Sequence, residues 1–364
     1  MSDSRSPGLA YAVTLIADTH FDEEPWSRYR DVGMASADPK TLADHRRNIE
    51  MWRSRLPSLL DAAAAVAKRE NAAFVQHLGD IAHGTAANGE ALTRMLSAGR
   101  RLIAERFGEI PFRFITGNHD LLAPGGLAAY RAWSGSPADG VFRTGPDAWI
   151  FIDSENPPGV ERLRELFREA RGARWTFFLS HRPLFPFSGT ASFRFLYSTD
   201  PECRQELVRL AAESRAIILS SHIHTVIHSV FDFPEGRVVQ FTANSLWSRD
   251  ELERVVFKPS SRRDWCRKLS SVPPERRAAL AALANEFRPY LELHRRAHCA
   301  GHFLLRADDD SVRVEIRGGS GLDPDETVIL ARQKSERTTN ARILRNIADL
   351  LRRALRIPRK STSR

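Results

Sequence analysis

The chain has 364 residues, of which 42% are hydrophobic, and this is enough apolar material to bury the core of one large domain or of two. Its formal charge of +9 favours anionic partners such as phosphates, nucleic acid or an acidic membrane surface, unless it only reflects an arginine-rich proteome. Three widely spaced cysteines without a CxxC pair argue against a disulfide framework or a cysteine zinc site. No apolar stretch approaches the roughly 20 residues of a membrane span. We therefore expect a cytoplasmic protein.

Five short apolar runs predict buried strands, and each ends in polar residues that can bind a metal. They cover residues 10–20, 72–80, 111–120, 174–183 and 216–224. Helical patterns lie between or after them, over residues 41–70, 88–107, 159–171 and 201–214. The alternation predicts an α/β fold, in which ligands bind beyond the carboxyl ends of the strands. We therefore expect all five strand ends to meet in one cleft.

The pattern changes after residue 224. Two β-hairpins are predicted, over residues 226–243 and 301–319, and the charged segment between them, 249–298, is predicted to be a helical insertion. These elements give one domain over residues 1–320 and a tail over 321–364.

The tail holds a basic amphipathic helix at 339–357. Such a helix can lie on an anionic membrane surface, which would make the protein peripheral to a membrane, or it can dock on a partner. It can equally pack against the protein's own core or against a second copy of the chain.

The polar residues at the strand ends form a mixed oxygen and nitrogen donor set. They are Asp18, His20, Asp80, Asn118, His119, Asp120, His181, His222 and His224. Carboxylate, amide and imidazole donors together suit two closely spaced cations of the manganese, iron or zinc type, whereas calcium and magnesium favour oxygen cages. The sequence therefore predicts a site for two divalent or trivalent metal ions.

The order of these blocks resembles that of the calcineurin-like metallophosphoesterase superfamily, whose pattern is DxH, GD, GNH[DE], H and GHxH. The chain reads Asp18-Thr19-His20, Gly79-Asp80, Gly117-Asn118-His119-Asp120, His181 and Ser221-His222-Ile223-His224. The resemblance covers roughly residues 10–245 and implies a four-layer α/β/β/α sandwich. One position departs from the pattern, because Ser221 stands where the family has glycine.

The resemblance also implies a role for each block. Asp18, His20 and His224 would hold one metal, and Asn118, His181 and His222 the other, with Asp80 bridging both. A hydroxide that bridges the cations would attack a phosphodiester or phosphomonoester. A nuclease acting on DNA or RNA is the alternative, and a non-catalytic scaffold of the same fold is a third reading.

His119 follows the metal-binding block and is expected to act as general acid, protonating the departing alkoxide. Asp120 is expected to accept a hydrogen bond from the His119 imidazole, or else to cap the helix that follows. Arg182 and Arg194 are candidate contacts to the substrate phosphate, although Arg182 could instead form an ion pair at the surface. The sequence predicts neither the substrate nor the oligomeric state.

Overall fold

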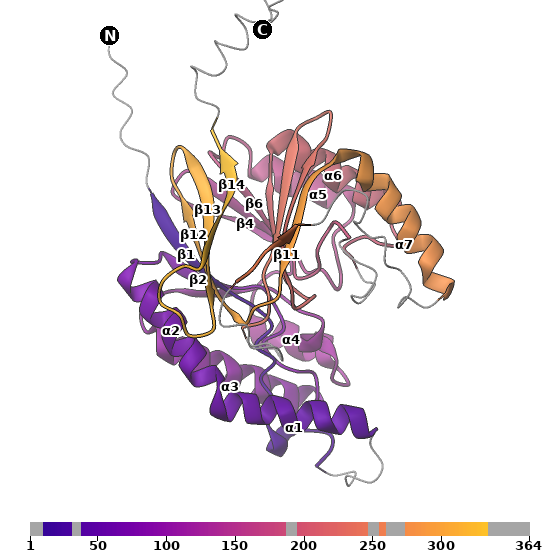
Figure 1. The fold of residues 1–364 in the computed structure, drawn as a ribbon. Coiled ribbons are helices and arrows are strands. Elements are labelled where there is room, and N and C mark those ends of the chain that lie inside the picture. The colour runs from indigo at the N-terminus through magenta and orange to yellow at the C-terminus, as the bar shows by residue number, and fades with distance from the viewer. Residues whose placement is uncertain (1–9, 31–37, 187–194, 247–254, 260–273, 334–364) are drawn as a thin grey trace, which may run out of the picture.

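The computed structural model describes residues 10–30, 38–186, 195–246, 255–259 and 274–333. Two β-sheets pack face to face, and helices cover the outer face of each sheet (Figure 1). The predicted four-layer α/β/β/α sandwich is therefore confirmed.

The first sheet has six strands and joins both ends of the described chain. Its order is β14 (Glu326–Arg332), β13 (Ser311–Gly318), β12 (Gly301–Ala307), β1 (Tyr11–Ile16), β2 (Phe74–His77) and β3 (Phe112–Phe114). The last three strands run parallel to one another, whereas β12, β13 and β14 form an antiparallel meander that joins β1 through β12. The parallel arrangement brings the carboxyl ends of β1, β2 and β3 to one edge.

The second sheet has eight strands. Its order is β10 (Lys258–Pro259), β11 (Leu291–Ala297), β8 (Val226–Asp232), β9 (Arg237–Thr242), β7 (Ile217–Ser220), β6 (Thr176–Leu179), β5 (Asp147–Phe151) and β4 (Gly140–Thr144). Strands β5, β6, β7 and β9 are parallel neighbours, so their carboxyl ends also share an edge.

Each helix group buries one apolar face on its own sheet. The six-stranded sheet is covered by α1 (Pro39–Ser54), α2 (Leu56–Arg69), α3 (Gly89–Phe107) and α4 (Gly126–Ser134). The eight-stranded sheet is covered by α5 (Val160–Glu169), α6 (Pro201–Ser214) and α7 (Pro274–Phe287). Short 3-10 helices occupy Glu24–Trp26, His119–Leu121 and Arg288–Tyr290.

The space between the sheets forms a separate apolar core. Val13 and Leu15 of β1, Trp149 of β5 and Phe177 of β6 are completely buried there, and the rings of Trp149 and Phe177 stack with centroids 4.1 Å apart. The central strands are thus covered on both faces, which explains their nearly continuous apolar runs.

Four features differ from the sequence predictions. The helix expected over 41–70 is two helices that meet at Arg55, because Pro57 in the first turn of α2 cannot donate a backbone hydrogen bond. The expected helical insertion 249–298 is helical at α7, but Leu291–Ala297 is strand β11, paired with β8. The six-stranded sheet continues past residue 320 through β14. Strands β4 and β5 form a hairpin that the sequence analysis missed.

The predicted basic helix at 339–357 lies outside the described residues. Among the helices that are described, none is both long and apolar enough to cross a membrane.

Candidate metal centre

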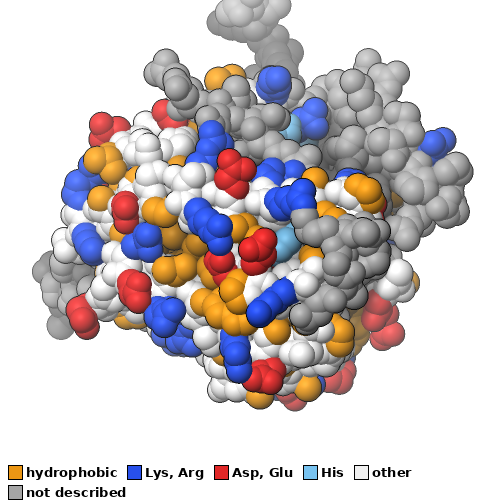
Figure 2. Space-filling model, turned by 90° about the horizontal axis from the view of Figure 1, so that it is seen from below, with side chains coloured by type: hydrophobic (Ala, Val, Ile, Leu, Met, Phe, Trp, Pro, Cys, Tyr) orange, Lys and Arg blue, Asp and Glu red, His pale blue; other side chains and the backbone are white. Residues whose placement is uncertain are grey.

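The polar residues that follow five parallel strands meet at one edge of the sandwich. Asp18 and His20 follow β1, Asp80 follows β2, Asn118 follows β3, His181 follows β6, and His222 and His224 follow β7. Histidine side chains reach the surface on the underside of the molecule, beside acidic and basic side chains (Figure 2). All seven residues that the sequence named as metal ligands are brought together at this edge.

One group of donors consists of Asp18, His20 and His224. The Nε2 atoms of His20 and His224 lie 3.0 Å apart, and His224 Nε2 lies 3.3 Å from Asp18 Oδ1. Asp18 Oδ1 is buried and accepts no hydrogen bond of good geometry within the described part of the chain. Two imidazole nitrogens face each other here, beside a carboxylate oxygen that has no hydrogen-bond donor of good geometry among the described residues. This arrangement suits the binding of a cation better than a hydrogen bond between the two rings.

A second group consists of Asn118, His181 and His222. Asn118 Oδ1 lies 3.2 Å from His181 Nε2, and one nitrogen each of His181 and His222 lies within 4.8 Å of a carboxylate oxygen of Asp80. The Nδ1–H of His181 donates to the carbonyl of Leu78 at 2.8 Å, which leaves Nε2 as the ring nitrogen that could bind a metal.

Asp80 stands between the two groups. Its Oδ2 lies 3.8 Å from His20 Nε2 and 3.2 Å from His181 Nε2. Its Oδ1 accepts the backbone N–H of His119 at 2.8 Å, and this bond fixes the plane of the carboxylate. The donor set therefore fits two cations that share one carboxylate.

The backbone holds these residues in an unusual conformation. Asp18, His20, Asp80, His222 and His224 have φ values of 47°, 48°, 59°, 73° and 47°, in the left-handed region. Non-glycine residues seldom adopt this region, and it costs on the order of 1–3 kcal/mol per residue. Five of the predicted ligands share this strain, which indicates that the surrounding fold imposes the geometry of the site.

Two glycines let the strand ends approach closely. A Cβ atom on Gly117 would lie 2.1 Å from the backbone nitrogen of Asp80, and one on Gly79 would lie 2.5 Å from His181 Nδ1. Ser221, which replaces the family's glycine, adds support instead: its hydroxyl donates to the Leu78 carbonyl at 2.7 Å and lies 3.0 Å from His181 Nδ1. The departure at Ser221 therefore leaves the ligand geometry intact.

The protonation of the histidines follows from burial and from the two carboxylates. Burial lowers the pKa of His20 and of His222 well below the usual value, so both rings are neutral. Burial also lowers the pKa of His181, but the charges of Asp80 and Asp18 outweigh it and raise that pKa to about 10. A cation that binds here must therefore displace a proton from His181.

His119 lies beside this centre, with its ring edge-to-face against His20 at 4.7 Å between centroids. Its Nδ1–H donates to the carbonyl of His83 at 2.6 Å, and its ring stacks on that of His83. Nε2 is therefore the ring atom of His119 left for a substrate.

The expected role of Asp120 is wrong. Its carboxylate contacts backbone instead of the His119 imidazole: Oδ2 accepts the N–H groups of Asp80 and Gly117 at 3.0 and 2.9 Å, and Oδ1 accepts that of Ala82 at 2.9 Å. Complete burial raises the pKa of Asp120 to about 7, against the effect of the backbone donors. Asp120 thus ties the β2 and β3 loops together, and the His83 carbonyl orients His119 in its place.

Arg182 has a partner that the sequence analysis did not identify. Its guanidinium binds both carboxylate oxygens of Glu155, at 2.5 and 2.6 Å, and its Nη1 lies 3.0 Å from His222 Nε2. The side chain is buried, so contact between Arg182 and substrate stays a prediction. Arg194 lies outside the described residues.

Three supporting contacts were also missed. The Ser245 hydroxyl donates to the Asp18 carbonyl at 2.7 Å, the Trp52 indole donates to the Thr19 carbonyl at 2.8 Å, and the Thr19 hydroxyl lies 3.0 Å from His77 Nε2. The signal for Glu155 was its place four residues after strand β5, on the same edge as the site. The others have no local signal, because their partners are distant in the chain.

Comparisons with known proteins agree with this geometry. The model of a family described as calcineurin-like phosphoesterase matches residues 11–226. The fold is similar to that of purple acid phosphatase PPD1 from yellow lupin (Lupinus luteus) seeds, with a TM-score of 0.51 and 12% identity, covering 90% of this chain and 54% of that one. It is also similar to a structure of PhoD, with a TM-score of 0.54 and 9% identity, covering 90% of this chain and 73% of that one.

These identities show a shared fold and no more. The chain spans about half the length of the lupin phosphatase. A sequence search of curated proteins found no match.

Proposed function

The chain belongs to the calcineurin-like phosphoesterase family, and on that premise we propose that it is a metal-dependent hydrolase of phosphodiesters or phosphomonoesters with His119 as general acid. The observation that supports this most directly is the position of Asp80, whose Oδ2 faces histidines of both donor groups. A carboxylate oxygen so placed could be shared by two cations.

The donor set favours manganese, iron or zinc, because four imidazoles accompany two carboxylates and one amide oxygen. When bound, the cations would supply positive charge opposite the phosphoryl oxygens and a water activated at neutral pH. The protein's own part is to hold the seven donors in place, five of them through the left-handed backbone of the strand ends.

His119 would hold the proton for the leaving group. Its backbone N–H is bound by Asp80 Oδ1, and its Nδ1–H by the carbonyl of His83, so the ring has a fixed direction relative to the metal-binding carboxylate. A proton on Nε2 could then pass to the departing alkoxide as its bond to phosphorus breaks. Help of this kind is worth roughly 10²–10⁴-fold in rate.

Metal content and turnover test the proposal together. The full chain, supplied in turn with manganese, zinc and iron, is assayed on bis-nitrophenyl phosphate, nitrophenyl phosphate, cyclic nucleotides, glycerophosphodiesters and single-stranded DNA. We expect two metal ions per chain and turnover of at least one ester; hydrolysis of DNA alone would favour the nuclease alternative.

A matched pair of variants separates the site from general effects on folding. His222→Asn removes a predicted ligand, whereas His294→Asn changes another buried histidine, on β11, whose Nδ1 lies 2.8 Å from the hydroxyl of Ser229. We expect His222→Asn to lose metal and activity and His294→Asn to keep both. A wild-type protein that stays free of metal and inactive with every cation would overturn the proposal.

A further inference from the structure

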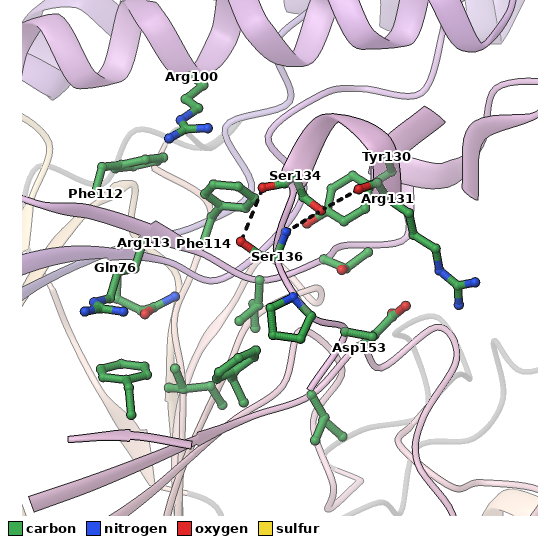
Figure 3. Close-up of a pocket in the computed structure, with 18 residues that line it drawn as sticks. Gln76, Arg100, Phe112, Arg113, Phe114, Tyr130, Arg131, Ser134, Ser136 and Asp153 are labelled. Carbon is green, nitrogen blue, oxygen red and sulfur yellow. Dashed lines mark hydrogen bonds between the residues drawn. The ribbon is translucent and has the colours of Figure 1, made fainter. Parts of the chain in front are cut away.

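A cavity of about 460 Å³ lies at the open edge of the sandwich, between the edge strands β3 and β4. Its walls come from both sheets and from α4, and Figure 3 shows the lining residues. The volume falls within the range of small-molecule sites. None of the seven predicted metal ligands lines the cavity, so it is a separate feature of the molecule.

The walls combine half-buried aromatic rings with arginines. Phe112 and Phe114 of β3, Phe142 of β4 and Phe151 of β5 each keep part of the ring accessible at the cavity. Arg100 lies with Phe112 and Phe114 on the helix side of β3, whereas Arg113 lies with Gln76 on the opposite face, toward Phe142, and Asp153 lies apart from both arginines (Figure 3). Aromatic rings left partly exposed around a cavity favour a flat apolar ligand.

The two arginines are held by ring stacking. The guanidinium carbon of Arg113 lies 4.2 Å from the ring centroid of Phe142, and that of Arg100 lies 5.2 Å from the ring centroid of Phe114. Within the ranges that the structure describes, neither arginine has a carboxylate at ion-pair distance. A guanidinium whose face is stacked keeps its N–H groups available in the plane, which is the arrangement that binds phosphate or carboxylate.

Other arginines of this chain behave differently. Arg162 pairs with Asp139 at 2.8 Å, Arg174 with Asp147 at 2.7 Å, and Arg204 with Glu286 at 2.9 Å. The guanidinium groups of Arg100 and Arg113 differ from these three in having no carboxylate at ion-pair distance among the described residues. On the far side, Asp153 Oδ1 accepts the backbone N–H of Glu155, and the carboxyl group adds an acceptor for a ligand hydroxyl or amine.

We propose that this cavity binds a small molecule that carries a flat ring and a phosphate or carboxylate group, with the ring against Phe142 and Phe151 and the anion on Arg113. The cavity lies beside the candidate metal centre, since Thr116 lines the cavity and stands two residues before Asn118. On the other side, Asp153 lines the cavity and is followed by Ser154, whose hydroxyl accepts the backbone N–H of Arg182. The inference concerns binding alone and holds whether or not the proposed hydrolase activity does.

Calorimetric titration of the full, metal-loaded chain tests the proposal. The probes are the methylene-phosphonate analogue of AMP, which cannot be hydrolysed, together with adenosine and inorganic phosphate, which each carry one half of it. We expect the analogue to bind at least tenfold more tightly than either half, and more weakly at 300 mM than at 50 mM salt. An analogue that binds no better than inorganic phosphate would show that the rings take no part and would overturn the proposal.

Variants locate the binding. Arg113→Gln should weaken it about tenfold or more, since it removes charge-assisted hydrogen bonds, whereas Arg100→Gln, on the other face of β3, should change it little. Arg143→Gln is the matched control, because Arg143 on β4 donates to the carbonyls of Glu169 and Arg171 and does not line the cavity. We expect Arg143→Gln to bind normally, and we expect turnover of Arg113→Gln on nitrophenyl phosphate to match that of wild type.

A metal-site variant separates the two sites. Binding of the analogue should survive in His222→Ala. If it is lost in His222→Ala but kept in Arg113→Gln, the probe occupies the metal centre and the proposal is wrong.

Discussion

Replacing Asp120 distinguishes a structural role from a catalytic one. Its carboxylate accepts three buried backbone N–H groups, from Asp80, Ala82 and Gly117. Asp120→Ala leaves all three without an acceptor, and each costs about 1–3 kcal/mol, so the free energy of unfolding should fall by about 3–9 kcal/mol. That is a large share of the 5–15 kcal/mol typical of a domain.

Asp120→Asn refines the test. Because Oδ2 accepts two of the three bonds, an asparagine that turns its oxygen toward Asp80 and Gly117 leaves only the Ala82 N–H unpaired. We expect a loss of about 1–3 kcal/mol for this variant. Asp61→Ala is the surface control, since this exposed carboxylate forms an ion pair with Arg106 at 3.3 Å, and it should stay within about 0.5 kcal/mol of wild type.

Urea unfolding followed by circular dichroism measures these differences, with and without a chelator, and turnover is measured on the same samples. The structural role predicts a graded loss of stability, from Asp61→Ala through Asp120→Asn to Asp120→Ala. The reasoning is refuted if Asp120→Ala unfolds within 1 kcal/mol of wild type, above all if it loses turnover as His119→Ala does.

Three further predictions follow from the site and the core. His119→Ala should keep its metal and lose about 10²–10⁴-fold in turnover of alkyl esters, but less for nitrophenyl esters with acidic leaving groups; equal losses would contradict the general acid role. Gly117→Ala should lower the metal content measured by emission spectrometry, because its Cβ would lie 2.1 Å from the Asp80 nitrogen, and full metal occupancy would show that the loop can shift. Burial, with Arg317 nearby, lowers the pKa of His302 to about 3. Below pH 6.5 the unfolded chain therefore binds a proton on His302 more readily than the folded chain does. The free energy of unfolding then falls as the pH falls, by about 2 kcal/mol at pH 5. His302→Phe should remove the contribution of His302 to the difference in unfolding free energy between pH 7.5 and pH 5, as measured by urea unfolding. An unchanged difference would contradict the role given to His302.

The sequence was sufficient to predict which residues gather at the candidate metal centre. Each donor directly follows an apolar run, and parallel strands necessarily gather their carboxyl ends at one edge. Residues from Asp18 to His224 could therefore be placed together from local patterns, which also predicted an α/β fold, whereas the four-layer sandwich was predicted from the family resemblance. Among the strands that were missed, β11 alternates exposed and buried positions irregularly, and β4 is a short strand at the edge of its sheet.

Only the tertiary structure decided which groups these residues contact. Asp120 and His119 are adjacent in sequence, yet the carboxylate binds the loops after β2 and β3, and the imidazole binds the His83 carbonyl. Arg182 pairs with Glu155, 27 residues away, in the same manner. Hydrogen bonds of this kind depend on distances between loops from different strands, and on left-handed backbone angles at residues such as Asp80 that side-chain patterns do not encode. Residue types thus determined which donor groups the candidate site offers, whereas packing of the strand ends determined which groups each side chain contacts.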